Sequence, residues 1–192
     1  MYKLALTGNI ASGKSFVEKI FSEYGLCVID TDKITHDLLC SSDVKNILRQ
    51  NFGLEIFEND TVSRKKLGKI VFENNDKRKI LENILHPLIK EEIFKFFEIH
   101  KSEKAVVVSV PLLFEAGMQD IFDKILFVSA DVSVRLERLM KRNNLTKEEA
   151  ILRINAQNNE DLKISKSDFV FYNNSSFEDL KFQVDNFIKQ YL

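Results

Sequence analysis

The most informative segment of this sequence is Gly8-Asn9-Ile10-Ala11-Ser12-Gly13-Lys14-Ser15. It follows a strand-like segment at residues 3–7 and precedes an amphipathic helical pattern at residues 14–24. The two glycines let the backbone turn so that successive N–H groups face one anion, and the helix adds the positive end of its dipole. This spacing predicts a phosphate-binding loop in which Lys14 reaches the phosphates and the Ser15 hydroxyl coordinates Mg²⁺.

Outward from this loop, short apolar runs alternate with longer helical patterns. Apolar runs without in/out alternation are typical of strands that are covered on both faces. Strands are expected at residues 3–7, 26–29, 105–110, 125–128 and 169–171, and helices at 14–24, 132–142 and 177–191. The alternation predicts an α/β fold with a five-stranded parallel sheet between two helical layers.

Two segments depart from simple alternation. About seventy residues separate the second and third strands, far more than an ordinary connection requires. Their helical periodicity, as in Leu81, Ile84, Leu85 and Leu88, predicts an inserted helical lobe. A second stretch, residues 141–166, is dense in Lys, Arg, Asn and Glu, and we expect it to form a mobile helical flap.

The composition excludes several functional classes. The 192 residues carry 28 basic and 29 acidic side chains, a net charge of −1, so there is no electrostatic footprint for nucleic acid or an anionic membrane. Cys27 and Cys40 form no CxxC motif, which favours a reduced chain, although a single disulfide stays open. Neither a membrane-spanning run nor a signal-peptide layout is present. We expect a cytoplasmic protein without a nucleic-acid, membrane or obligate protein partner.

An acidic pair, Asp30 and Asp32, directly follows the second strand. Carboxyl ends of parallel strands border the ligand crevice, and residues i and i+2 of an extended segment share a face. One carboxylate would accept a proton from an attacking hydroxyl, while the other would orient that hydroxyl or hold Mg²⁺ through water. The alternative is that Asp32 caps a helix that begins at Lys33.

Missing motifs narrow the class further. The third strand ends Val108-Ser109-Val110-Pro111, without the carboxylate that often follows this strand, and neither DxxG nor [NT]KxD occurs. A guanine-specific switch therefore lacks its two main supports, and a small-molecule kinase is favoured. Two other interpretations stay open: a kinase of a different small hydroxyl acceptor, and a nucleotide-dependent switch without catalysis.

The order of motifs over nearly the whole chain resembles the dephospho-CoA kinase family. The phosphate loop is shared by a whole superfamily, whereas the His-Pro and Pro-Leu-Leu-Phe-Glu segments are close to diagnostic. The matching segments after the loop are 28–32, 63–67, 71–72, 85–89 (Leu-His-Pro-Leu-Ile), 110–115 (Val-Pro-Leu-Leu-Phe-Glu), 138–142, 153–157 and 168–173.

The resemblance implies ATP-dependent phosphorylation of the ribose 3′-hydroxyl of dephospho-CoA, which gives CoA and ADP. It implies a single P-loop kinase domain over residues 1–192, with a three-layer fold. Residues 1–32 and 105–192 would form the nucleotide-binding core, residues 33–104 the inserted CoA-binding lobe, and residues 135–165 a helical lid.

The resemblance also assigns roles to residues. Asp32 matches the candidate base, Lys14 and Ser15 match the phosphate and metal residues, Arg142 matches an ATP-contacting arginine of the lid, and Asn173 lies near the adenine. The expected ATP-binding residues are Gly8, Asn9, Ile10, Ala11, Ser12, Gly13, Lys14, Ser15, Phe16, Arg142 and Asn173. The expected acceptor-binding residues are Asp32, His36, Arg64, His86 and Leu112. ATP and Mg²⁺ are the implied cofactors, with Ser15 as the metal ligand.

Several positions invite a second interpretation. Asn9 and Ala11 replace two glycines of the commoner family loop, Gly-Gly-Ile-Gly-Ser-Gly-Lys, so we expect no left-handed backbone at Ala11. Arg135 is interpreted as part of a solvated helix face. Arg153 and Gln157 form either a lid contact or a helix-surface pair. His86, placed at the start of a helix, is interpreted as a cap or a core residue.

Overall fold

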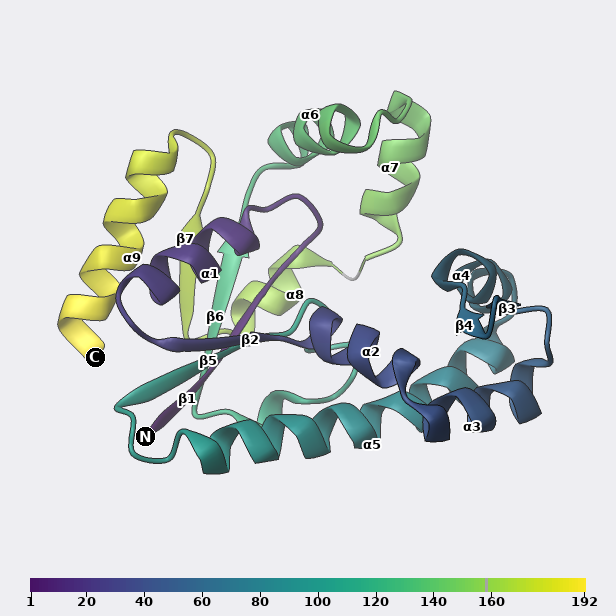
Figure 1. The fold of residues 1–192 in the computed structure, drawn as a ribbon. Coiled ribbons are helices and arrows are strands. Elements are labelled where there is room, and N and C mark those ends of the chain that lie inside the picture. Colours follow the sequence, from purple (N-terminus) through teal and green to yellow (C-terminus); the bar gives the residue numbers. More distant parts are fainter. Residues whose placement is uncertain (158) are drawn as a thin grey trace. The chain divides into compact units, whose positions relative to one another are not determined.

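The computed structural model describes residues 1–157 and 159–192 (Figure 1). The chain divides into two compact units. One unit contains Met1–Asp30 and His100–Leu192, and the other contains Thr31–Ile99. The inserted lobe was predicted at residues 33–104 and the lid at residues 135–165, and both ranges stay predictions.

The larger unit is built on a five-stranded sheet with the strand order β2-β5-β1-β6-β7. All four neighbouring pairs are parallel, which confirms the predicted α/β fold. Leu6 in the central strand pairs with Ser109 on one side and Leu126 on the other. The strands are β1 (Tyr2–Gly8), β2 (Cys27–Asp30), β5 (Ala105–Ser109), β6 (Lys124–Ser129) and β7 (Phe169–Tyr172).

The strand order sets the place of the ligand crevice. From β1 the chain crosses to β2 on one side, whereas β6 and β7 lie on the other side of β1. Ligands of open parallel sheets bind beyond the carboxyl ends of the strands at such a reversal. The loop that follows β1 is therefore at the expected binding position.

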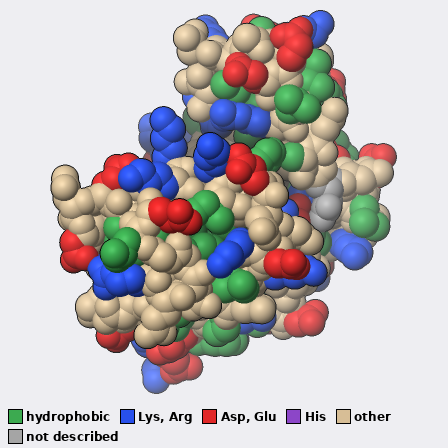
Figure 2. Space-filling view, turned by 90° about the vertical axis from the view of Figure 1, so that its right-hand side faces the viewer, with side chains coloured by type: hydrophobic (Ala, Val, Ile, Leu, Met, Phe, Trp, Pro, Cys, Tyr) green, Lys and Arg blue, Asp and Glu red, His purple; other side chains and the backbone are tan. Residues whose placement is uncertain are grey.

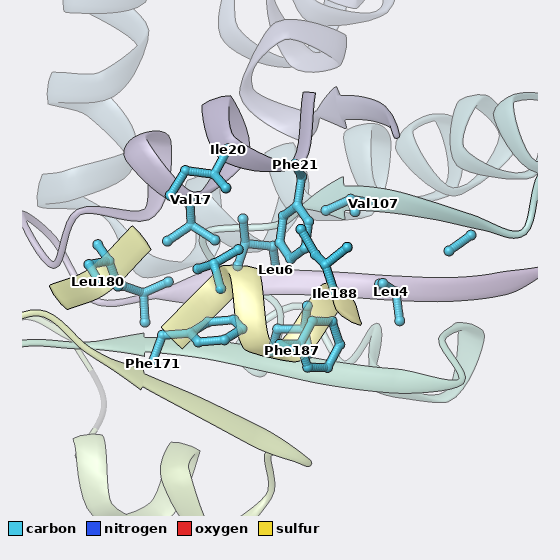
Figure 3. Packing of buried hydrophobic residues seen from close by; sticks show 14 residues of the cluster. Leu4, Leu6, Val17, Ile20, Phe21, Val107, Phe171, Leu180, Phe187 and Ile188 are labelled. Atoms are coloured by element: carbon cyan, nitrogen blue, oxygen red, sulfur yellow. The ribbon is translucent and has the colours of Figure 1, made fainter. Parts of the chain in front are cut away.

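Helices α1 and α9 supply the main core of this unit. Val17, Ile20 and Phe21 of α1 are buried against the sheet, together with Phe187 and Ile188 of α9 (Figure 3). The rings of Phe21 and Phe187 meet edge to face with centroids 6.2 Å apart. Each fully buried side chain of this size contributes about 1.5–3 kcal/mol, so this face anchors the sheet under the loop. The helices of the unit are α1 (Lys14–Glu23), η1 (Gln119–Ile121), α6 (Val132–Asn143), α7 (Lys147–Asn155), α8 (Glu160–Ser165) and α9 (Phe177–Tyr191).

The smaller unit is mainly helical. Its elements are α2 (Thr31–Cys40), α3 (Ser42–Phe52), β3 (Phe57–Glu58), β4 (Thr61–Val62), α4 (Arg64–Glu73) and α5 (Asn75–Ile99). The long helix α5 buries Leu85, Ile89, Ile93 and Phe97, which recur every fourth residue and so line one face. The short antiparallel hairpin β3–β4 was not predicted from the sequence. Its turn residues Asn59 and Asp60 both have positive φ, as a tight hairpin turn requires.

The surface carries mixed charge. Figure 2 shows Lys and Arg side chains interspersed with Asp and Glu side chains over the face in view, with hydrophobic side chains scattered among them. This mixture agrees with the net charge of −1. Among the described helices, none is long and apolar enough to cross a membrane.

Candidate active site

The phosphate loop lies between β1 and α1, and its two glycines are required by close approaches. A Cβ atom on Gly8 would lie 2.7 Å from both Ser12 Oγ and the Val128 carbonyl oxygen. A Cβ on Gly13 would lie 2.1 Å from Asn173 Nδ2, and Gly13 has a φ of 102°. Any larger residue at either position would displace the loop, so the predicted loop geometry depends on both glycines.

Ala11 has a φ of 62°, so the expectation that this position avoids the left-handed region is wrong. Such a conformation costs an L-residue about 1–2 kcal/mol. The surroundings compensate: Ser12 N donates to the Asn9 carbonyl oxygen at 3.1 Å, which closes the turn. Ala11 also packs against the buried cluster of Leu139, Ala150 and Ile154. Tertiary packing therefore overrides the local preference.

Lys14 is held by two partners. Its Nζ lies 2.5 Å from Glu18 Oε1 and also donates to Ser109 Oγ. Ser109 Oγ in turn donates to Glu18 Oε1 at 2.5 Å. Ser109 ends β5, where the sequence lacks a carboxylate, and Glu18 supplies one from α1 instead. Glu18 was not predicted from the sequence, although its position four residues after Lys14 on one helix was a usable signal.

Asn173 contacts the loop directly. Its side chain is 1% exposed, and Nδ2 donates to the Ser12 carbonyl oxygen at 2.7 Å. Its Oδ1 accepts from Arg138 Nη2 at 3.2 Å. The other guanidinium nitrogen of Arg138, Nη1, is buried without a hydrogen-bond partner among the described residues. An anion bound beside the loop, such as a phosphate, could accept a hydrogen bond from this buried cationic donor.

Arg142, the arginine assigned by resemblance, has a different environment. It lies in the last turn of α6, is exposed, and donates from Nε to Asn143 Oδ1 at 3.0 Å. Arg138, one turn earlier on α6, is half-buried. From the sequence Arg138 was named only as part of a motif, because nothing local distinguishes it from Arg142.

A buried ion-pair network lies behind Asn9. Lys163 Nζ donates to Asn9 Oδ1 at 3.0 Å and lies 2.7 Å from Glu115 Oε1. The Lys163 side chain is 3% exposed and that of Glu115 is 15% exposed. Glu115, a residue of the diagnostic Pro-Leu-Leu-Phe-Glu segment, is thus the buried partner of a cation. The network fixes α8 to the phosphate loop.

Glu160 extends the network to α6. It accepts from Asn9 Nδ2 at 3.0 Å and from Ser129 Oγ at 2.6 Å. Arg135 Nη2 lies 2.8 Å from Glu160 Oε2, and Arg135 Nε donates to the Ala130 carbonyl oxygen at 2.9 Å. Arg135 is 3% exposed, so its interpretation as part of a solvated face is wrong. The side chain of this arginine is directed instead to a carboxylate distant in sequence.

Gln157 binds the tip of the loop. Its Oε1 accepts from Ile10 N at 2.7 Å. Helix α7 ends at Asn155, so Arg153 and Gln157 are not a helix-surface pair, and that alternative is wrong. The side chain of Gln157 satisfies a backbone donor of the loop instead.

Asp32 lies in the first turn of α2, which begins at Thr31. The expectation that Asp30 and Asp32 share an extended segment is therefore wrong. The alternative, that Asp32 caps a helix beginning at Lys33, is also wrong. His36 follows Asp32 by four residues on the same helix. An acid and an imidazole at this spacing lie on one helix face.

The remaining acceptor-side candidates are spread over the chain. Arg64 is exposed at the first position of α4. His86 lies inside α5 rather than at its start, so its interpretation as a cap is wrong. Burial lowers the pKa of His86; Glu82 opposes this shift and Lys90 adds to it. Leu112 belongs to the larger unit and is 50% exposed.

The loop is chemically suited to a nucleoside triphosphate. Backbone N–H groups, the helix dipole of α1, Lys14 and the buried Arg138 Nη1 all supply positive charge. Ser15, exposed in the first turn of α1, offers the hydroxyl that a magnesium ion would need. The donor set of the loop fits a magnesium-bound polyphosphate.

Comparisons with known proteins agree with this chemistry. The family model described as dephospho-CoA kinase matches residues 2–179. A dephospho-CoA kinase of Helicobacter pylori is 39% identical over 98% of this chain and 97% of its own length. One of Fusobacterium nucleatum is 40% identical over 96% of this chain and 95% of its own length.

Solved structures share the fold of this chain. A dephospho-CoA kinase from Campylobacter jejuni superposes with a TM-score of 0.74 and 31% identity, over 98% of this chain and 96% of that one. A Thermus thermophilus protein, TT1252, superposes with a TM-score of 0.86 and 28% identity, over 100% of this chain and 98% of that one. A shikimate kinase from Bacteroides thetaiotaomicron, at 16% identity and a TM-score of 0.54, shares the fold.

Proposed function

Because this chain belongs to the dephospho-CoA kinase family and so transfers a phosphoryl group from ATP to dephospho-CoA in coenzyme A biosynthesis, we propose how its residues divide the work. The phosphate loop with Lys14 and Arg138 binds the triphosphate, and Asp32 activates the ribose 3′-hydroxyl. The observation that carries the nucleotide part is the contact between Asn173 and the loop. Beside that contact lies Arg138 Nη1, which is buried and has no hydrogen-bond partner in the described part of the chain.

Lys14 exchanges partners when ATP binds. Glu18 and Ser109 hold its ammonium group at the base of the loop, with both ion-pair side chains less than one-fifth exposed. A triphosphate carries more negative charge than one carboxylate, so it competes for Lys14 while Glu18 keeps its bond to Ser109. Preorganisation of this kind suits phosphoryl transfer, in which the protein chiefly positions groups and stabilises charge.

Ser15 would hold the magnesium ion, which, when bound, neutralises charge on the phosphates. Ser15 is an exposed residue, and it directly follows Lys14 in the first turn of α1. Arg142 stays a second candidate for the ATP phosphates by resemblance, and Gly8, Asn9, Ile10, Ala11, Ser12, Gly13 and Phe16 complete the proposed ATP site.

Asp32 is proposed as the group that orients and deprotonates the acceptor hydroxyl. It is an exposed carboxylate at the start of α2, two residues after the strand that ends at Asp30. His36, Arg64, His86 and Leu112 are proposed to contact the acceptor. A positioned base contributes on the order of 10²–10⁴ in rate.

Closure of the lid, proposed at residues 135–165, would exclude water from the transferred group. Its last helix, α8, is fixed to the loop by Lys163 and to α6 by the Glu160–Arg135 pair. We expect the enzyme to act in the cytoplasm, without nucleic acid, membrane or an obligate partner.

The decisive experiment follows the conversion of dephospho-CoA to CoA by mass, with ATP and Mg²⁺ and purified protein. Lys14→Met should abolish ATP binding or turnover. Asp32→Asn should lower kcat by at least about 10²-fold with little change in ATP affinity. Unchanged turnover of Asp32→Asn would exclude Asp32 as the base. ATP hydrolysis that no hydroxyl acceptor stimulates would instead support a nucleotide-dependent switch.

A further inference from the structure

A second group of metal-binding side chains lies outside the proposed ATP site. Cys27, His100 and Glu103 each offer one ligand atom, and these atoms all lie within 4.8 Å of one another. All three residues belong to the larger unit. Cys27 and His100 are half-buried, and Glu103 is exposed. The proposed phosphoryl-transfer chemistry uses none of the three.

The backbone fixes the three side chains near one another. Cys27 is the first residue of β2 and pairs with Val106 in β5. His100 and Glu103 lie in the turn before β5, where Glu103 N donates to the His100 carbonyl oxygen at 2.9 Å. Tyr2 N donates to the carbonyl oxygen of Lys104 at 2.7 Å, so the end of this turn is also bonded to β1. The ligands therefore come from hydrogen-bonded backbone and not from a free loop.

The position separates this group from the phosphate loop. Cys27 and the turn before β5 lie at the amino ends of their strands, whereas the loop follows the carboxyl end of β1. In a parallel sheet, all amino ends lie on one side and all carboxyl ends on the other, so the two groups lie at opposite ends of the strands. A metal here would be distinct from the magnesium that accompanies ATP.

We propose that Cys27, His100 and Glu103 bind one Zn²⁺ ion. A thiolate, an imidazole and a carboxylate are the three ligand types that zinc prefers, with bonds of about 2.0–2.3 Å. In a tetrahedral site such bonds place ligand atoms about 3.3–3.6 Å apart, so side-chain movements of about 1 Å suffice. Water completes the fourth position. A soft thiolate ligand disfavours Mg²⁺ and Ca²⁺, which prefer oxygen.

Charge supports the same metal. The thiolate and the carboxylate together neutralise the charge of one Zn²⁺ ion. Lys104 Nζ is directed to the carbonyl oxygen of Leu192 at 3.4 Å. Bound zinc would join β2 to the turn that precedes β5. His100 in this turn is the first residue of the larger unit after Thr31–Ile99. The role of the metal would be to stabilise that junction.

The test uses Co²⁺ and Zn²⁺ with the full-length protein. Co²⁺ should give tetrahedral d–d absorption together with a thiolate-to-cobalt charge-transfer band, and Zn²⁺ should displace it. Cys27→Ser should abolish the charge-transfer band and weaken Zn²⁺ binding by about 100-fold or more, and Glu103→Gln should weaken it by about 10-fold or more. Cys40→Ser should change neither, because the exposed Cys40 lies in α2.

A measurement on the unmutated protein guards against misfolded variants. Zn²⁺ should slow maleimide labelling of Cys27 by about 10-fold or more, since the metal occupies the thiolate, while Cys40 labels at an unchanged rate. Equal protection of both cysteines, protection of neither, or undiminished Zn²⁺ affinity of folded Cys27→Ser would each overturn the proposal. Because these readouts need neither ATP nor dephospho-CoA, they are independent of the kinase assignment.

Discussion

Lys163 and Asn9, 154 positions apart in the chain, share a buried hydrogen bond of 3.0 Å from Nζ to Oδ1. Asn9 is the second residue of the phosphate loop, and Lys163 lies in α8. Asn9 also donates from Nδ2 to Glu160 Oε2, so one amide bridges both ends of the ion-pair network. A glycine at position 9 could not make this bridge, because it has no side chain. The substitution for the commoner glycine thus ties the loop to α8 in this chain.

Loss of the Lys163 cation should destabilise the protein strongly. In Lys163→Met, the mostly buried Glu115 carboxylate loses its partner, which typically costs about 3–5 kcal/mol. Urea unfolding measures the effect. Glu115→Gln in the same background should recover a large part of the loss, because the uncompensated charge is then removed. If the losses of unfolding free energy in Lys163→Met and Glu115→Gln, measured separately, add up to the loss in the double variant, the two residues are not coupled.

Gly13→Ala should abolish ATP binding. The added Cβ would meet Asn173 Nδ2 at 2.1 Å, and the φ of 102° is strained for any L-residue. Gly68→Ala is the matched control, since Gly68 lies inside α4 and a Cβ added there would meet nothing within 4 Å. Removal of a helical glycine should raise the free energy of unfolding by about 0.5–1 kcal/mol. Nucleotide titration and urea unfolding check both variants, and normal ATP affinity of Gly13→Ala would contradict the loop geometry.

Arg138 and Arg142 should differ in their effect on ATP. Removal of a charge-assisted hydrogen bond costs about 1.5–3 kcal/mol, so Arg138→Ala should raise KM for ATP by roughly 10- to 100-fold. Arg142→Ala should have a smaller effect, since Arg142 is exposed and its Nε donates to the neighbouring Asn143. Steady-state kinetics at saturating dephospho-CoA separate the two. A larger loss for Arg142→Ala would overturn the assignment of the phosphate contact to Arg138.

His86 should make stability depend on pH. Burial lowers its pKa in the folded chain below the usual 6.5, so at mildly acidic pH the unfolded chain binds this proton more readily. The stability that buried, neutral His86 contributes should be fully present above about pH 6.5. The free energy of unfolding should then fall as the pH drops through the pKa of His86 in the folded chain. Urea unfolding at about pH 7.5 and about pH 5.5 measures the difference. His86→Asn should reduce this difference, whereas His36→Asn, at an exposed position, should retain it. An unchanged slope in His86→Asn would refute the role of burial.

Most elements of the fold could be predicted from local sequence patterns. The helix at Phe177–Tyr191 was predicted with its observed bounds, because its apolar face repeats at helical spacing. The structure adds an N-cap at Ser176, whose side chain accepts from Asp179 N. Each observed strand bound lies within one residue of the predicted bound, since continuous apolar runs are typical of buried parallel strands. The hairpin β3–β4 was not found because two-residue strands leave no periodic signal.

Local sequence patterns specify the loop and the parallel sheet, because G-x-x-x-x-G-K-[ST] and the apolar runs act over a few neighbouring positions. Three features were not predictable from such patterns: Arg135 is buried against Glu160, Ala11 adopts a left-handed backbone, and Asn9 joins Lys163 to Glu160. Each of these depends on partners distant in the chain or on packing around the loop. Desolvation and long-range charge pairing set such contacts, and neither leaves a local pattern.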